Sequence, residues 1–535
     1  MNMFKGLLTL VFLSLSLPTF AAPVVGGTFL NNLGAEPPTL NPLSSQDASA
    51  SEIENYTMSA LLERNPDTYE WEESVAEKWS ISKDGMTFDF KIREGVTFHD
   101  GKPLTAEDVK FTFDAIMDKE NKYKTAHRRS YFENFESVEV IDQYNVRFKA
   151  KEVYFANFDQ AAGLSIVPKH VYADTSKKAE KKLNKTIVGS GPYILDEFKR
   201  GRQIMLKRNP NWYGWKLKTK KGEHNYERIL FRFLKEPEVE LQRFEKGDLD
   251  FVGLSPEKFV LRAKGGKWGK DLIKKKVENK APSGYSFIGF NLTSPIFSSV
   301  KTRKALAMLV NKPLMNEKFQ FDLSLSANGP VYRQSFYNNT DVKPVEYDPK
   351  AALALLREDG WADKDGDGIL EKNGVKLSFT ILEPLQDFIK YLTIFQEDAK
   401  KAGVDINVKY VEWNTFIKLL NERKFDAVRL AWTGGQVDWD PKQVWHSSSI
   451  ANEGSNFVQY SNPKVDKLID ESRATMDRNK RAQMLKQVHK IISDDHAYIY
   501  FFNRKYALYA HNKRVKMEKD TYNYTIGASH WWLEP

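Results

Sequence analysis

The segment WSISKDGMTFDFKIREGVTFHDGKPLTAEDVKFTFDAI, residues 79–116, decides the predicted fold because a strand, turns and a helix follow one another in it. Residues 86–92 alternate between apolar and polar side chains, and this period of two predicts a strand with one buried face. A helix is predicted to begin after Thr105, because Thr is a good N-cap and Asp108 completes a capping box.

The same segment resembles the signature of family 5 extracellular solute-binding proteins. The matching residues are Asp84-Gly85, Phe90, Arg93–Val96, Phe98–Gly101 and Leu104–Val109. Members of this family are periplasmic receptors that feed oligopeptide, dipeptide and nickel ABC importers. The resemblance runs from Val24 to about Tyr509 and therefore covers nearly the whole chain.

The resemblance implies an α/β fold of the type II periplasmic binding class, cluster C-like, with two hinged lobes and an extra domain. Short apolar strands alternating with helical patterns agree with this class. The expected division is a signal peptide (1–21), a discontinuous first lobe (22–50, 181–280 and 497–535), an extra domain (51–180) and a second lobe (281–496). Two crossings between the lobes, near residues 281 and 497, are expected to form the hinge.

Composition narrows the possible functions. The 535 residues are 41% apolar and provide for large cores. There is no cysteine, which excludes disulfides, thiolate catalysis, Cys-ligated zinc and a lipid anchor on a lipobox cysteine. The net charge is +9, but the Lys-rich clusters are short and mixed with acids, as solvated surfaces are, so no nucleic acid is expected as a partner.

The N-terminus reads as a secretory signal. Lys5 supplies the positive charge, residues 6–20 form an apolar run, and Thr19-Phe20-Ala21 offers a cleavage site. A periplasmic monomer without a lipid anchor is the expected product. The alternative is an uncleaved helix that anchors the chain to the membrane.

The sequence carries no recognisable catalytic or cofactor motif. Gly-x-Ser-x-Gly, His-Glu-x-x-His and a Walker loop are all missing, and the nine His residues do not cluster at metal-ligand spacing. His99 and Asp100 are adjacent, but neighbours on an extended chain point to opposite sides. We therefore expect a protein that is not an enzyme and needs no cofactor.

A weak candidate for a calcium site lies in residues 363–371. Asp363, Asp365 and Asp367 occupy the first acidic positions of an EF-hand-like loop, and Gly366 supplies the turn. Gly374 stands where the bidentate Glu is needed. We favour the interpretation as an acidic turn and predict no bound metal.

The ligand site is predicted around the loop after strand 425–432. In peptide-binding members of the family, a Trp at this strand end precedes an Asp that pairs with the α-amino group of the peptide. That Asp lies three residues after the Trp and four before a Pro. Here those counts from Trp432 and Pro441 reach Gly435 and Val437, so Asp438 is the nearest candidate and Asp440 the next. The alternative for both is capping of the following helix.

Other residues are expected around the same cleft. Gly434 and Gly435 allow close approach of a ligand to the main chain, and an extended peptide can pair with exposed strand-end backbone. For the aromatic candidates, the alternative is a place in the aromatic core. For Asn31 and Asn32, the alternative is an ordinary turn. The full predicted set is Asn31, Asn32, Tyr285, Phe287, Trp432, Thr433, Gly434, Gly435, Asp438, Asp440, Tyr498 and Tyr500.

The function that the resemblance implies is capture of a peptide and its delivery to an inner-membrane ABC permease. One alternative is the same role for an oligosaccharide, an opine or a metal chelate. The other is a periplasmic enzyme or chaperone built on this fold.

Overall fold

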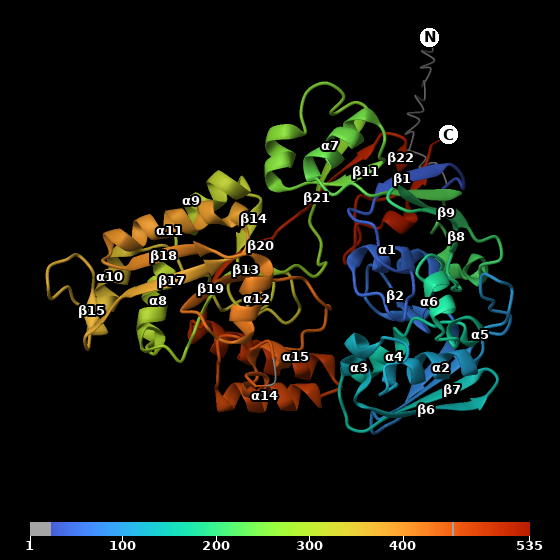
Figure 1. The fold of residues 1–535 in the computed structure, drawn as a ribbon, viewed down its shortest axis with the longest axis horizontal. Coiled ribbons are helices and arrows are strands. Elements are labelled where there is room, and N and C mark those ends of the chain that lie inside the picture. The colour runs from blue at the N-terminus through green and yellow to red at the C-terminus, as the bar shows by residue number, and fades with distance from the viewer. Residues whose placement is uncertain (1–22, 452–453, 535) are drawn as a thin grey trace, which may run out of the picture.

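The computed structural model describes residues 23–451 and 454–534, so the predicted signal peptide lies outside the described residues. The chain forms an α/β structure whose sheets are covered by helices (Figure 1). The predicted residue boundaries of the two lobes and of the extra domain stay a prediction, and we describe each region by its sheets.

The first lobe contains one mixed sheet and one antiparallel sheet. Strands β1 (Thr28–Asn32), β10 (Arg228–Arg232), β9 (Gln203–Arg208) and β8 (Tyr193–Lys199) lie in that order, with β1 and β10 parallel. A second sheet has the order β11 (Phe251–Gly253), β21 (Ala507–Asn512) and β12 (Leu272–Val277). Both termini of the described chain lie beside these sheets (Figure 1).

The β4–β7 sheet contains the segment that opened the sequence analysis. Its order is β4 (Ala76–Ile81), β5 (Thr87–Ile92), β7 (Asn145–Ala150) and β6 (Phe135–Asp142). The alternation predicted for residues 86–92 is confirmed, because Phe88, Phe90 and Ile92 are buried while their neighbours are not. Helix α2 (Ala106–Met117) covers this sheet, and its predicted capping box is present, with the Thr105 N–H donating to Asp108 Oδ2 at 3.0 Å.

His99 of the same segment anchors it to residues 189–191. The His99 N–H donates to the Gly189 carbonyl at 2.8 Å, and its ring Nε2 lies 3.2 Å from the Gly191 carbonyl. Burial lowers the pKa of His99 to about 4, so the ring is neutral at pH 7. The residue therefore holds two chain segments together.

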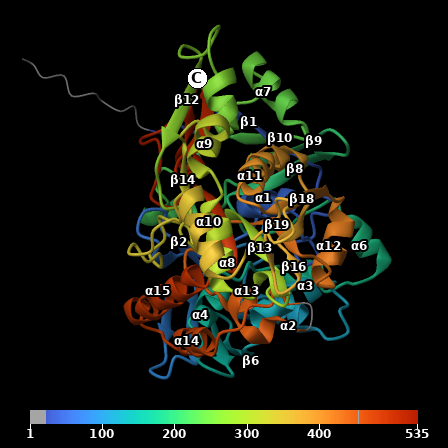
Figure 2. The same cartoon turned by 90° about the vertical axis from the view of Figure 1, so that its left-hand side faces the viewer.

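The second lobe is built on a six-stranded mixed sheet. The order is β14 (Ser324–Ser326), β20 (Tyr498–Arg504), β13 (Tyr285–Phe290), β19 (Ala427–Trp432), β17 (Ser378–Glu383) and β18 (Asp405–Tyr410). Helices α8 (Val300–Met308), α10 (Pro349–Glu358) and α11 (Ile389–Lys401) pack on it, and Figure 2 shows α8 beside α10. The interior side chains of these elements form the largest core cluster of this lobe.

Further helices and three two-stranded sheets belong to the described chain. The further helices are α1 (Ala48–Thr57), α3 (Ala126–Phe132), α4 (Ala156–Ala162), α5 (Lys169–Tyr172), α6 (Lys177–Leu183), α7 (Pro237–Lys246), α9 (Lys312–Met315), α12 (Trp413–Asn421), α13 (Lys442–Trp445), α14 (Pro463–Arg473) and α15 (Arg478–Asp494). The two-stranded sheets are β2 (Leu62–Arg64) with β3 (Trp71–Glu73), β15 (Glu371–Lys372) with β16 (Val375–Lys376), and β22 (Val515–Lys516) with β23 (Trp532–Leu533).

Two chain segments connect the lobes. One runs from β12 to β13 through residues 278–284, which contains the crossing expected near 281. The other lies between β20 and β21 at residues 505–506, later than the position expected near 497, because β20 pairs with β13 inside the six-stranded sheet. On the opposite side of the molecule, α14 and α15 approach α3 and α4 (Figure 1).

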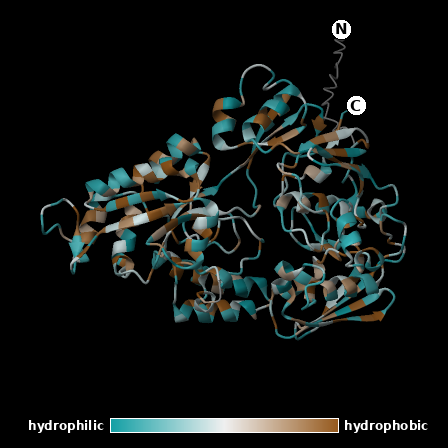
Figure 3. Cartoon of the chain, in the orientation of Figure 1, coloured by the Kyte–Doolittle hydropathy of each residue, from teal (hydrophilic) through white to brown (hydrophobic). Residues whose placement is uncertain are grey.

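The helices that cover the sheets carry both polar and apolar residues (Figure 3), as expected for amphipathic helices with one buried face. In the described ranges 23–451 and 454–534, no helix is both long enough and apolar enough to cross a bilayer.

Candidate ligand-binding cleft

We call residues 62–165, which surround the β4–β7 sheet, the β4–β7 region. A cavity of about 350 Å³ lies between this region, through its β2–β3 hairpin and helices α3 and α4, and the loop that follows β19. It is lined by charged, aromatic and small residues. These are Arg64, Tyr69, Trp71, Ile116, Arg128, Tyr131, Phe132, Asp159, Gln160, Gly163, Leu164 and Ser165 on one side and Gln436 and Asp438 on the other. A cavity walled by both regions is suited to a ligand that bridges them.

Arg64 and Asp159 form an ion pair on the wall of this cavity. Arg64 Nη2 lies 2.7 Å from Asp159 Oδ1, and the same oxygen accepts a hydrogen bond from Trp71 Nε1 at 3.0 Å. The Arg64 guanidinium also stacks 3.9 Å above the Trp71 ring. Burial raises the pKa of the Asp159 carboxyl above its ordinary value, and the Arg64 charge opposes that shift.

Asp438 reaches the cavity from the loop after β19. Its Oδ1 accepts hydrogen bonds from the Tyr337 hydroxyl and from Arg478 Nε at 2.9 Å, and Arg481 Nη2 lies 3.7 Å from it. Burial and the negative charge of Asp438 raise the pKa of Tyr337 to about 12, which keeps this hydroxyl a donor. The carboxylate is thus fixed in place by three side chains behind it.

Asp159 and Asp438 share one feature that is important for a ligand. In each carboxylate all hydrogen bonds from the described residues go to Oδ1, and Oδ2 accepts none. Both residues line the same cavity, and the negative charge of Asp438 contributes to the raised pKa of Asp159. Two carboxylate oxygens are therefore available there for a cationic or hydrogen-bond-donating group.

Asp440 has a different role from Asp438. Its Oδ2 accepts a hydrogen bond from the Tyr154 hydroxyl at 2.8 Å and forms an ion pair with Arg473, while its Oδ1 accepts from the Lys442 N–H at 3.1 Å. The Phe155 N–H donates to the Arg473 carbonyl at 2.9 Å. Asp440 therefore bridges the β4–β7 region to the second lobe and also accepts a hydrogen bond from the first N–H of α13, whose N-cap residue is Pro441.

The loop between Trp432 and Asp438 packs closely on the lobe crossing. Trp432 is half-buried and stacks with the Phe457 ring at 6.0 Å between centroids. A Cβ on Gly434 would lie 2.3 Å from the Pro282 carbonyl oxygen, so the missing side chain lets the loop approach the crossing rather than a ligand. Thr433 and Gly435 are exposed, and space around Gly435 is open.

The structure places the four aromatic candidates from β13 and β20 in a core cluster. Phe287 and Tyr498 stack with 3.8 Å between ring centroids, and Tyr285 and Tyr500 meet edge to face at 5.4 Å. All four are less than a tenth exposed, and none lines the cavity that contains Asp159 and Asp438. Here the rings form the layer behind the Trp432 loop.

Asn31 and Asn32 lie at the end of β1, apart from that cavity. The Asn32 amide donates to the Leu234 carbonyl at 3.0 Å and to Glu240 Oε1 at 2.9 Å, and its oxygen accepts from the Leu234 N–H at 2.9 Å. Asn31 Oδ1 accepts from the Asn32 N–H at 2.9 Å. Both amides thus organise the turn that follows the strand.

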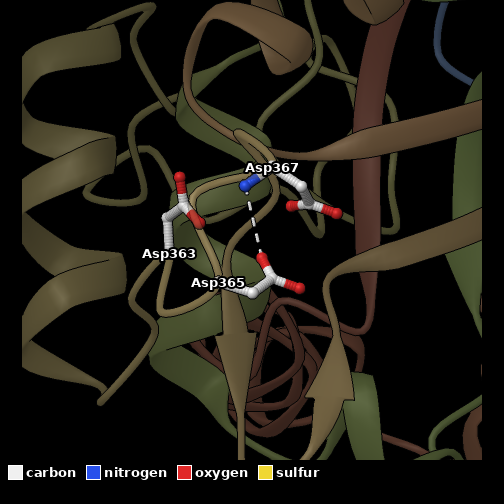
Figure 4. Close-up of side chains that lie close together, drawn as sticks. All are labelled: Asp363, Asp365 and Asp367. Carbon is white, nitrogen blue, oxygen red and sulfur yellow. Dashed lines mark hydrogen bonds between the residues drawn. The ribbon is translucent and has the colours of Figure 1, made fainter.

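The acidic loop at 363–368 forms the turn that we favoured. Asp363 accepts from the Gly366 and Gly368 N–H groups at 2.8 and 3.0 Å, and Asp365 accepts from the Asp367 N–H (Figure 4). The three carboxylates lie within 4.8 Å of one another. Lys376 Nζ pairs with both Asp365 (3.0 Å) and Asp367, so an ammonium already balances the cluster.

Calcium is therefore expected to have little effect on this protein. The loop lacks the bidentate carboxylate that dominates EF-hand affinity, and a cation would have to displace Lys376. We expect EDTA to leave the thermal midpoint unchanged in a scanning fluorimetry experiment. A fall of many degrees that calcium restores and magnesium does not would contradict this interpretation.

Sequence reasoning missed the side of the site that the β4–β7 region contributes. Arg64 and Trp71 lie opposite each other on the β2–β3 hairpin, and Asp159 comes from α4 far along the chain. The aromatic pair Tyr69 and Trp71 close to Arg64 was the available signal, since Arg commonly stacks on such rings. No sequence feature near Arg64 or near Asp159 indicated that these two residues would pair.

Comparisons with known proteins agree on one family. Residues 70–455 match the profile described as bacterial extracellular solute-binding proteins, family 5 middle. The chain is 28% identical to the oligopeptide-binding protein AppA of Bacillus subtilis over 529 residues, covering 96% of this chain and 92% of that protein. It is 27% identical to the dipeptide-binding protein of Escherichia coli over 509 residues, covering 90% of each.

A solved structure gives the same result at the level of the fold. The structure of AppA from Bacillus subtilis in complex with a nonapeptide superposes with a TM-score of 0.75 at 27% identity. The match covers 96% of this chain and all of that one.

Proposed function

Because this chain belongs to family 5 of the bacterial extracellular solute-binding proteins, we propose that it captures a short peptide and delivers it to the permease of an ABC importer. The location that follows is the periplasm, with the predicted signal peptide removed. The protein acts by binding, and no catalytic step is part of the proposal.

The observation that carries the proposal is the pair of free carboxylate oxygens in the cavity. A peptide with a free amino end brings an ammonium group, which has three donors and no acceptor. Asp159 Oδ2 and Asp438 Oδ2 offer acceptors from the two walls of one cavity, and Arg64, Arg478 and Arg481 hold these carboxylates from behind. We place the amino end of the ligand between them.

The rest of the peptide then extends along both walls. Trp71 and Tyr69 offer aromatic faces on one side, and the exposed Thr433–Gln436 backbone offers amide groups on the other. A site that binds the backbone and the amino end of a peptide can accept peptides of many sequences. Of the remaining predicted residues, Trp432 stays a proposed contact, while the aromatic layer behind it supports the loop.

Ligand binding is coupled to closure in this proposal. A ligand that contacts Asp159 and Asp438 together favours the arrangement in which the two walls are near each other. Asp440, Tyr154 and Arg473 stabilise that arrangement directly. The two crossings at 278–284 and 505–506 are the proposed hinge.

Peptides are expected to stabilise the chain from residue 22 onward. At a ligand concentration near 100 times Kd, the free energy of unfolding should rise by about 2.7 kcal/mol. A thermal-shift screen with mixed di- to pentapeptides measures this. No shift at millimolar peptide would count against a peptide ligand.

Native mass spectrometry of the purified protein separates the alternatives. A mixture of retained peptides supports the proposal. One defined small molecule indicates an oligosaccharide, an opine or a metal chelate instead.

A further inference from the structure

A second cavity, of about 260 Å³, lies in the second lobe at the edge of the six-stranded sheet. Its walls come from α8, α9, the loop at 341–345, the end of α15 and the first half of β20. It shares no lining residue with the cavity that contains Asp159 and Asp438. Its size is just below the range of about 300–1,000 Å³ that is typical of pockets for drug-sized ligands.

Lys312, the first residue of α9, lines this cavity and is only 4% exposed. Among the described residues, no carboxylate oxygen lies within 4.0 Å of its Nζ and no acceptor bonds to it. Burial lowers the pKa of Lys312 to about 8, and the group is still charged at pH 7. A buried ammonium without a partner is unfavourable unless something in the cavity compensates it.

A buried cationic side chain without a protein partner is unusual within the described residues. Among the described residues, the other buried Lys and Arg side chains all contact an anion or carbonyl oxygens of the protein. Lys220 pairs with Glu63, Arg303 donates to the Phe297 and Asp495 carbonyls, Arg429 pairs with Glu383, and Arg481 donates to the Thr475 carbonyl. Lys312 differs because its partner is missing from the protein itself.

Neutral donors accompany this charge. Ser493 also lines the cavity, but its hydroxyl oxygen packs against Gly329 and has almost no accessible surface, so it is not available as a donor to an anion. Strand β14 pairs with β20 only at residues 502–504, so the described chain leaves the 498–500 segment without a partner strand on that side. An ammonium and strand-edge N–H groups are donors that bind a carboxylate or phosphate oxygen.

The mouth of the cavity does not repel a small anion. Asp341 and Asp494 are acidic, but Lys343 and Lys490 balance them, and Lys490 Nζ pairs with Asp494 Oδ2 at 2.7 Å. We propose that this cavity is a second binding site, for a small oxyanion such as a carboxylate or inorganic phosphate, with Lys312 as its counter-charge.

The test compares anions at equal ionic strength. Thermal midpoints and calorimetric titrations of the chain from residue 22 onward are measured in sodium acetate, sodium phosphate and sodium chloride. Acetate or phosphate is expected to give a saturable stabilisation that chloride does not. An acetate response identifies a carboxylate site, and a phosphate response identifies a site for the inorganic ion.

Variants link the response to the cavity. Lys312→Met keeps the length of the side chain without its charge and should weaken anion binding by at least about tenfold. Lys110→Met is the matched control, because Lys110, like Lys490, pairs with an Asp four residues later but does not line the cavity, and it should retain the response. If Lys312→Met does not fold, Lys312→Gln tests the same charge, and Lys312→Arg, which keeps the charge, should retain the response.

Two results would overturn the proposal. One is a wild-type protein that responds to neither oxyanion up to roughly 100 mM, far above a millimolar Kd, which would mean that water alone fills the cavity. The other is a folded Lys312 variant that binds the anion as the wild type does. Peptide binding in the cleft is a separate measurement and is expected to be unchanged in Lys312→Met.

Discussion

Replacing Asp159 or Asp438 by asparagine is expected to weaken binding of peptides with a free amino end by about 2–5 kcal/mol. Each substitution removes one of the two charges that receive the ligand ammonium, and truncation leaves that ammonium poorly compensated in a dry cavity. Calorimetry with one peptide in its free and N-acetylated forms measures the effect. The acetylated peptide lacks the ammonium and should lose much less affinity.

Controls separate this effect from damage to the fold. Asp438→Asn also removes the partner of Arg481, which is almost fully buried, so the stability of each variant is measured without ligand. Asp114→Asn, on the exposed face of α2, is the surface control. Equal losses for both peptide forms would make the carboxylates structural, and unchanged affinities would remove them from the site.

Replacing Arg429 by methionine is expected to lower the free energy of unfolding by about 3–5 kcal/mol. Arg429 Nε and Nη2 lie 2.6 and 2.5 Å from the two oxygens of Glu383, and the side chains are 3% and 0% exposed. The substitution leaves the Glu383 charge uncompensated between the neighbouring strands β17 and β19. Denaturant unfolding, with hydrogen exchange of these strands, measures the loss.

The chain supplies a matched control for this pair. Arg147 and Asp89 also form a two-bond ion pair between neighbouring strands, at 2.7 and 3.0 Å, but they are 39% and 42% exposed. Arg147→Met should cost less than about 1 kcal/mol. The double variant Arg429→Met with Glu383→Leu should recover most of the loss, because no lone charge stays buried. Similar costs for Arg429→Met and Arg147→Met would contradict the prediction.

Local patterns allowed much of the fold to be predicted. The alternation in β5 and the Thr105–Asp108 capping box depend on residues a few positions apart, and both are confirmed. The long signature around them indicated the family, which the match over residues 70–455 shows. These features are encoded by neighbours in the chain and therefore appear in a single sequence.

The candidate site was predictable only in part. The resemblance to the family led to the loop after Trp432 and to Asp438, because the positions of Trp432 and Pro441 can be counted along the chain. It gave no means to see that Asp440 bridges to Tyr154 and Arg473, or that Tyr285 and Phe287 lie in a core layer. Aromatic residues on a strand look the same in sequence whether they face a ligand or a neighbouring ring.

The sequence by itself determined strand β5, the capping box of α2 and the family, because these features depend on residues close together in the chain. The tertiary structure alone decided which charges have partners. Asp159 meets Arg64 across 95 positions of sequence, and Asp438 meets Tyr337 across 101. Lys312 lies on a cavity without any such partner. Ion pairing falls off over a few ångströms in space and does not depend on separation along the chain, so only the folded arrangement assigns a role to each of these side chains.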